Sequence, residues 1–192
     1  MPTFTQHTRE SAPEAAKPLF DATQKKFGFT PNLIRVLAES PAAAEAYLTL
    51  TALLDQTSLD PIEQQVVLLS VSFENGCAYC MAAHSGVAKM VGASDELIEA
   101  LRAGTDLPEA KLNALSRFTR SVVRERGWVS DNEVQILLDA GYPQATVFEV
   151  LLGVALKTLS NYTNHIADTE IDDAFQDFAW QQPSASKSPA TA

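Results

Sequence analysis

Helix start and stop signals recur along the whole middle of the chain and leave little room for other structure. Serine, aspartate and proline open apolar segments, and glycines close them at positions 28, 92, 104, 127 and 141. Within these segments apolar residues recur every three or four positions, and no run alternates with a period of two. We therefore predict an all-α fold of eight or nine helices. The expected helices span residues 13–27, 31–38, 41–56, 61–74, 77–91, 94–103, 109–126, 130–140 and 143–166.

Length and composition indicate a single globular domain. The chain has 192 residues, of which 46% are hydrophobic and 20% charged, as in ordinary globular proteins. The first 24 residues lack the apolar core of a signal peptide, and no stretch approaches the ~18 apolar residues of a membrane span. We predict a flexible arm at residues 1–12, one helical domain at 13–180 and a disordered tail at 181–192, in a cytoplasmic protein.

The charge balance excludes some classes of partner. Lys and Arg total 14 against 24 for Asp and Glu, which gives a formal net charge of -10. Such a surface repels nucleic-acid phosphates and anionic lipids, so we expect no nucleic acid and no membrane as partner. The sequence also has no glycine pattern for nucleotide phosphates, and we expect no bound cofactor.

The residues that carry chemistry gather at the start of the predicted helix 77–91. Cys77, Cys80 and His84 occupy positions i, i+3 and i+7, which share one face of a helix. Thiols one turn apart can reach disulfide geometry, and an imidazole one turn further can accept a proton from Cys80. The first turn of a helix also favours a thiolate, because its free N–H groups and its dipole attract negative charge. This grouping predicts thiol redox chemistry.

Two other interpretations of these three residues stay open. Buried cysteines can act as small hydrophobic side chains beside a hydrogen-bonded histidine. The two thiols and the imidazole can instead supply three zinc ligands, although the sequence offers no clear fourth ligand and no second Cys-x-x-Cys motif.

The segment around the cysteines resembles a known family. The stretch EQQ at 63–65, followed by the pattern NGCxxCxxxH at 75–84, is similar to the signature of alkylhydroperoxidase AhpD-like proteins in the carboxymuconolactone decarboxylase superfamily. The resemblance is strong over residues 59–92 and extends to 129–168. It implies an all-helical fold, a homo-oligomer such as a trimer or hexamer, and thiol-dependent reduction of hydroperoxides.

The resemblance also assigns roles within the motif. Cys80 matches the peroxidatic thiol, Cys77 its resolving partner, and His84 belongs to a proton relay. The order of the two thiols comes from the resemblance alone, since in thioredoxin-like sites the first cysteine is usually the nucleophile. An external thiol or a protein reductant would return the resulting disulfide to the dithiol.

One relay position departs from the family. The family's glutamate lies twelve residues before the first cysteine, where this chain has Gln65. A glutamine orients water but does not accept a proton near neutral pH. Glu63 lies on the opposite face of the helix and fits the third position of a capping box that begins at Asp60. We therefore expect an altered relay and weak peroxidase turnover.

A second histidine is the other relay candidate. His165 ends the polar run SNYTNH at 160–165, in a helix that is otherwise apolar. It either lines the cysteine cavity as the missing base or acts as a cation at the negative end of the helix dipole. Trp128 and Trp180 are expected to be packing residues.

The expected function is therefore that of an enzyme, an alkylhydroperoxidase-like peroxidase with a Cys77/Cys80 dithiol–disulfide cycle and His84 in the relay. One alternative is a dithiol–disulfide oxidoreductase that acts on protein or small-molecule disulfides. Another is a non-enzymatic helical oligomer with a structural Cys/His site. Decarboxylation of a carboxylated lactone, a third reaction of the superfamily, does not need a Cys-x-x-Cys pair.

Overall fold

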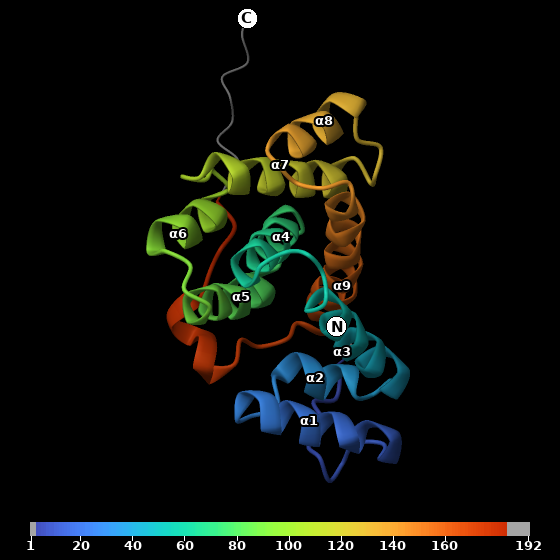
Figure 1. Cartoon of the computed structure of the whole chain (residues 1–192). Helices are drawn as coiled ribbons and strands as arrows, with labels where there is room; N and C mark the ends of the chain where they lie inside the picture. The colour runs from blue at the N-terminus through green and yellow to red at the C-terminus, as the bar shows by residue number, and fades with distance from the viewer. Residues whose placement is uncertain (1–2, 184–192) are drawn as a thin grey trace, which may run out of the picture.

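The structure is a computed structural model that describes residues 3–183, and all regular structure in this part is helical (Figure 1). The prediction of an all-α fold with eight or nine helices is confirmed, because nine α-helices occur among the described residues, with two short 3-10 helices at Glu14–Ala16 and Asp173–Phe178. The α-helices are α1 (Lys17–Phe27), α2 (Asn32–Leu37), α3 (Pro41–Leu54), α4 (Pro61–Glu74), α5 (Ala78–Met90), α6 (Asp95–Ala103), α7 (Ala110–Arg124), α8 (Asp131–Asp139) and α9 (Ala145–Ala167).

Helix α4 lies at the centre of the molecule (Figure 1). It contacts α5, α6, α7 and α9, and every residue from 65 to 72 is buried. A helix that is apolar on all sides belongs in the interior of a protein. The predicted capping box fixes its start: Glu63 accepts a hydrogen bond from the Asp60 N–H at 3.0 Å, and Asp60 accepts one from the Glu63 N–H at 2.8 Å.

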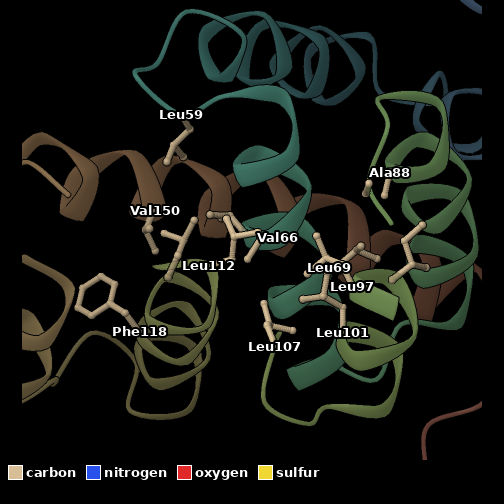
Figure 2. Close-up of a cluster of buried hydrophobic side chains, with 14 of the residues drawn as sticks. Leu59, Val66, Leu69, Ala88, Leu97, Leu101, Leu107, Leu112, Phe118 and Val150 are labelled. Atoms are coloured by element: carbon tan, nitrogen blue, oxygen red, sulfur yellow. The ribbon is translucent and has the colours of Figure 1, made fainter. Parts of the chain in front are cut away.

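The main hydrophobic core packs against one side of α4 (Figure 2). Val66 and Leu69 of α4 belong to one buried cluster with Leu101 of α6, Leu112 of α7 and Val150 of α9. Full burial of one such side chain contributes about 1.5–3 kcal/mol. These contacts fix the directions of the helices that approach α4, and two of the helices around it, α5 and α9, carry the chemistry.

The turn between α4 and α5 determines where the cysteines lie. Gly76 adopts the left-handed conformation, with a φ of 66°. Its N–H donates to the Phe73 carbonyl and the Cys77 N–H donates to the Ser72 carbonyl, both at 3.0 Å. This pair of bonds is the Schellman arrangement that ends a helix. It turns the chain so that Cys77 becomes the N-cap of α5.

The predicted arm at residues 1–12 is attached to the body over its described part. The His7 N–H donates to the Arg35 carbonyl at 3.0 Å, and Arg35 Nε donates to the His7 carbonyl at 3.0 Å. The His7 ring also contacts Glu39 at 2.8 Å and is buried. Composition did not reveal this attachment, because it depends on contacts between the arm and residues 35 and 39, about 30 positions further along the chain. Of the predicted tail at 181–192, residues 184–192 lie outside the described residues.

The two tryptophans differ in their surroundings. Trp180 is buried, and its Nε1 donates to the Arg102 carbonyl at 2.9 Å. The expectation that Trp128 is a packing residue is wrong within this chain, because 89% of its surface is exposed in the turn between α7 and α8.

Helix α9 has 23 residues and is the longest helix of the described part. Neither α9 nor another helix within residues 3–183 combines the length and the hydrophobicity that a membrane crossing requires. Helix α9 approaches α4 closely at Gly153, where an added β-carbon would lie 2.6 Å from Cγ1 of Val67. Valine is stiff about its first side-chain torsion, so Val67 cannot easily move aside.

We expect Gly153→Val to lower the free energy of unfolding by about 2 kcal/mol, because overpacking a filled core costs about 1–3 kcal/mol. Urea denaturation followed by circular dichroism measures this change. Adding Val67→Ala should recover part of the loss, since it removes the methyl groups that the new side chain meets. Wild-type stability in the single variant would contradict the close approach of α4 and α9.

Candidate active site

The structure brings together the three residues that the motif predicts. Cys77 caps α5, Cys80 lies in its first turn, and His84 lies one turn further along the same helix. The cysteines are reduced, and each is only 1% exposed. His84 is partly exposed. The two thiols therefore lie in the interior, and the His84 imidazole lies closer to the surface.

An apolar wall covers the two cysteines on the side of α2 and α3. Leu33 and Leu37 of α2 and Ala44 of α3 form one buried cluster with both thiols. Tyr79, between the cysteines, is fixed in this wall: its hydroxyl donates to Asp172 at 2.5 Å and accepts from the Leu33 N–H at 3.2 Å. Because the sulfur atoms have almost no exposed surface, a reactant must be small or must enter by local movement of this wall.

A polar stripe of α9 faces the cysteines from the other side. Lys157, Asn161 and Asn164 are spaced by four and three residues, so they share one face of the helix, and all are buried. Asn164 Nδ2 donates to Cys80 Sγ at 3.2 Å, and the hydroxyl of Ser160 lies 3.9 Å from the same sulfur. Lys157 is only 1% exposed.

These neighbours make the two thiols unequal. Burial by itself raises the pKa of Cys80, but a hydrogen bond from Cys77, the charge and hydrogen bond of Lys157 and the amide of Asn161 together hold that pKa well below its ordinary value. The pKa of Cys77 is raised, because its thiol donates to Cys80 and because it is buried. The two pKa shifts therefore favour a proton on Cys77, and Cys80 is the thiol that ionises first. Cys80 is the stronger nucleophile of the two.

His84 interacts with the residue at the altered relay position. Its Nδ1 lies 2.9 Å from Oε1 of Gln65, which is buried on α4. An amide oxygen only accepts, so Nδ1 carries the hydrogen and Nε2 keeps a free lone pair. Burial, and secondarily the charge of Lys157, lower the pKa of His84 well below its ordinary value. The imidazole is therefore neutral at pH 7, and the cation that stabilises the thiolate is Lys157.

The other acidic and basic candidates lie outside this group. Glu63 pairs with Lys111 at 2.9 Å, in addition to its part in the capping box, and Glu74 pairs with Arg120 at 2.5 Å. His165 is exposed in the last turn of α9, with its ring 6.3 Å from that of Tyr162. Its position fits a cation at the helix end, and the structure does not bring it to the cysteines as a base.

A metal centre receives no support from the geometry. Within residues 3–183, no group of three His, Cys, Asp or Glu side chains is arranged to hold a metal ion. The ammonium group of Lys157 also lowers the pKa of Cys80 through its charge, and the same positive charge would repel a cation bound to that sulfur.

The sequence analysis missed Lys157, Asn161 and Asn164, although it noted the polar run that contains the two asparagines. The informative signal was the spacing: a lysine and two amides at i, i+4 and i+7 interrupt the buried face of an apolar helix. Polar residues in such positions are rarely buried unless they have partners.

Comparison with known proteins agrees with this architecture. The sequence profile of the Carboxymuconolactone decarboxylase family matches residues 41–121, which include α4, α5 and the cysteine motif. A peroxidase-related protein from Ralstonia eutropha JMP134, described as an alkylhydroperoxidase AhpD core, superimposes with a TM-score of 0.80 at 19% identity, over 91% of this chain and 96% of that one. A peroxidase-related protein from Silicibacter sp. TM1040 gives 0.76 at 17% identity, over 89% and 93%.

A debrominase, Bmp8, solved in complex with 2,3,4-tribromopyrrole, has the same fold, with a TM-score of 0.77 at 19% identity over 93% of this chain and 96% of its own. No curated protein sequence matches the chain. The family profile therefore matches the segment that carries the cysteine motif, and the whole chain shares the fold of these AhpD-like and peroxidase-related structures. The descriptions of these structures name different activities, peroxidase-related in one case and debromination in the other.

We expect Lys157→Met to raise the pKa of Cys80, because it removes a positive charge that stabilises the thiolate. The rate of alkylation by iodoacetamide at neutral pH should then fall by about tenfold or more. Ultraviolet absorbance of the thiolate against pH measures the pKa. Lys89→Met, which removes an exposed lysine at the end of α5, is the matched control and should leave both values unchanged. An unchanged pKa in Lys157→Met would exclude this role of the lysine.

Proposed function

We propose that the protein is a thiol-dependent peroxidase that reduces hydroperoxides with the Cys77/Cys80 pair. The observation that carries the proposal is the unequal pair itself: a thiolate on Cys80, stabilised by Lys157, next to a protonated thiol on Cys77. A thiolate attacks peroxide oxygen, and a neighbouring thiol condenses with the sulfenic acid that forms. The burial of both sulfurs limits the substrate to small molecules.

The cycle follows from these groups. The Cys80 thiolate attacks the oxygen that bears hydrogen, an S–O bond forms and the O–O bond breaks, so sulfur loses two electrons and the peroxide is reduced to an alcohol. The departing alkoxide takes a proton from Lys157, and the relay through His84 returns a proton to the lysine. Cys77 then attacks the sulfenic acid, which forms the disulfide and releases water. An external thiol or a protein dithiol then reduces the disulfide. Reductants of this kind keep thiols reduced in the cytoplasm.

Two other activities are distinguished by substrate. A dithiol–disulfide oxidoreductase would use the same thiolate against a disulfide sulfur. Reductive dehalogenation is the second, because a protein with the same fold is a debrominase, and the dithiol supplies the two electrons that this reduction needs. The peroxidase proposal takes precedence because the small, covered site suits a compact oxidant better than a protein disulfide.

Single-turnover assays test the proposal. The reduced protein, freed of excess reductant, receives a small organic hydroperoxide, a small-molecule disulfide or a bromopyrrole in parallel, and remaining thiols are titrated. We expect the hydroperoxide to consume both thiols rapidly in the wild type. Cys77→Ser should stop at a trappable sulfenic acid on Cys80. In Cys80→Ser, the remaining thiol should react far more slowly than the thiols of the wild type. Reaction with the disulfide or the bromopyrrole alone would replace the peroxidase by that activity, and inert thiols would indicate a structural site.

The altered relay position gives a further prediction. Gln65→Glu places a carboxylate 2.9 Å from His84, where it raises the pKa of the imidazole and makes it a better proton carrier. We expect peroxide reduction to accelerate by about tenfold or more, within the usual range for general acid–base catalysis. Gln64→Glu on the same helix is the matched control, since Gln64 bonds to the Leu54 and Leu59 carbonyls instead. An unchanged or lower rate in Gln65→Glu would contradict an incomplete relay.

The proposal includes a homo-oligomer. Helix α9 exposes apolar side chains about half a turn away from its polar stripe, namely Phe148 (69% exposed), Leu151 (42%), Tyr162 (51%) and Ile166 (68%). Aligned apolar residues on one exposed helix face are typical of an interface. Light scattering of the wild type should give a multiple of the chain mass, and Ile166→Asp should lower it. A monomer at micromolar concentration would exclude the assembly.

A further inference from the structure

Two atoms beside Cys80 are buried without a hydrogen-bond partner. They are Nδ2 of Asn161 and Oδ1 of Asn164, one turn apart on α9. Asn161 is fully buried and Asn164 is 5% exposed. More than nine in ten buried polar groups in proteins are paired, so two orphans side by side indicate a small polar partner that this chain does not itself supply.

The remaining bonds of the two amides leave these atoms free. The Asn161 Oδ1 accepts from Asn75 Nδ2 at 2.9 Å, so its Nδ2 is the donor on the Cys80 side: it helps to lower the pKa of that thiol, but it completes no hydrogen bond of ordinary geometry, and it has two hydrogens to give. The Asn164 Nδ2 donates to Cys80 Sγ at 3.2 Å. Since a thiolate only accepts, the Asn164 amide must present nitrogen to the sulfur, and its oxygen is the free acceptor. One donor and one acceptor therefore border the nucleophilic sulfur.

We propose that Asn161 and Asn164 form the subsite that binds the two oxygen atoms of a hydroperoxide at Cys80. A hydroperoxide R–O–O–H has one hydrogen to donate, which matches Oδ1 of Asn164. Its second oxygen carries no hydrogen and accepts from Nδ2 of Asn161. A disulfide has no hydrogen to donate, and a bromopyrrole, whose donor is its ring N–H, has no oxygen next to that group to accept from Asn161. This inference rests on the proposed peroxidase function and names the residues that select its substrate.

The subsite also fits the chemistry of the step. As the Cys80–oxygen bond forms and the O–O bond breaks, negative charge develops on the leaving oxygen. The Asn161 amide then donates to an atom that becomes more basic, so its hydrogen bond strengthens in the transition state. The alkoxide leaves as the alcohol with a proton from Lys157, as in the cycle above. Asn164, bonded to the sulfur, holds the attacked oxygen within reach of it.

The test compares two reactions of the same thiolate. Oxidation by a small organic hydroperoxide needs the oxygen subsite, whereas alkylation by iodoacetamide needs only a reachable thiolate. We expect Asn161→Leu to lower the ratio of the oxidation rate to the alkylation rate by at least about tenfold, since loss of one such donor costs about 10²–10³ in rate elsewhere. Asn161→Asp, which keeps an acceptor for Asn75, serves if the leucine variant does not fold. Thr158→Val on the same helix removes a hydroxyl that bonds only to the Val154 carbonyl and should leave the ratio unchanged.

Each outcome decides the proposal. An unchanged ratio in both Asn161 variants, or an equal fall of both rates, would show that the asparagine acts on the sulfur or the fold and would overturn the subsite alone. An equal loss in Thr158→Val would overturn it as well. A wild-type protein that the hydroperoxide oxidises no faster than free cysteine at the same thiolate fraction would overturn the peroxidase function itself, and the subsite with it.

Discussion

The burial of one ammonium group beside two thiols is the interaction on which the site depends. Lys157 is almost completely enclosed, and none of the ion pairs within residues 3–183 involves it. A buried cation is costly unless an anion compensates its charge. The Cys80 thiolate is the anion that the surrounding side chains favour, and the charge of Lys157 is one of the groups that lower its pKa. The position of Cys80 in the first turn of α5, on which the sequence analysis relied, also favours the thiolate.

The substitution at Gln65 changes the charge balance of this interior. A carboxylate at that position would place a second anion close to His84 and compete with the thiolate for the positive charge of Lys157. With a glutamine there, the imidazole stays neutral and the cation acts on the sulfur alone. In the proposed peroxidase, the glutamine at this position would therefore leave the thiolate well stabilised and the proton relay weak, both for the same reason.

Local signals were sufficient for the elements and for one half of the site. The capping boxes at Asp60 and Ser130 and the glycine turn before Cys77 act over a few residues, so the pattern alone located the helices. Cys77, Cys80 and His84 lie on one helix, and their spacing placed them together. The other half was not predictable in the same way: His165 was as polar a candidate as Asn164, one residue before it, and only the rotation of α9 against α5 buried one and exposed the other.

The sequence by itself determined the all-helical fold, the start of α4 and the grouping of the two thiols with the imidazole, because those features rest on hydrogen bonds and spacings within single turns. The tertiary structure decided which thiol is charged, which cation charges it and which amides border it. These depend on how close α9 lies to α4 and α5, a distance that the packing of Gly153 against Val67 sets and that no local pattern encodes.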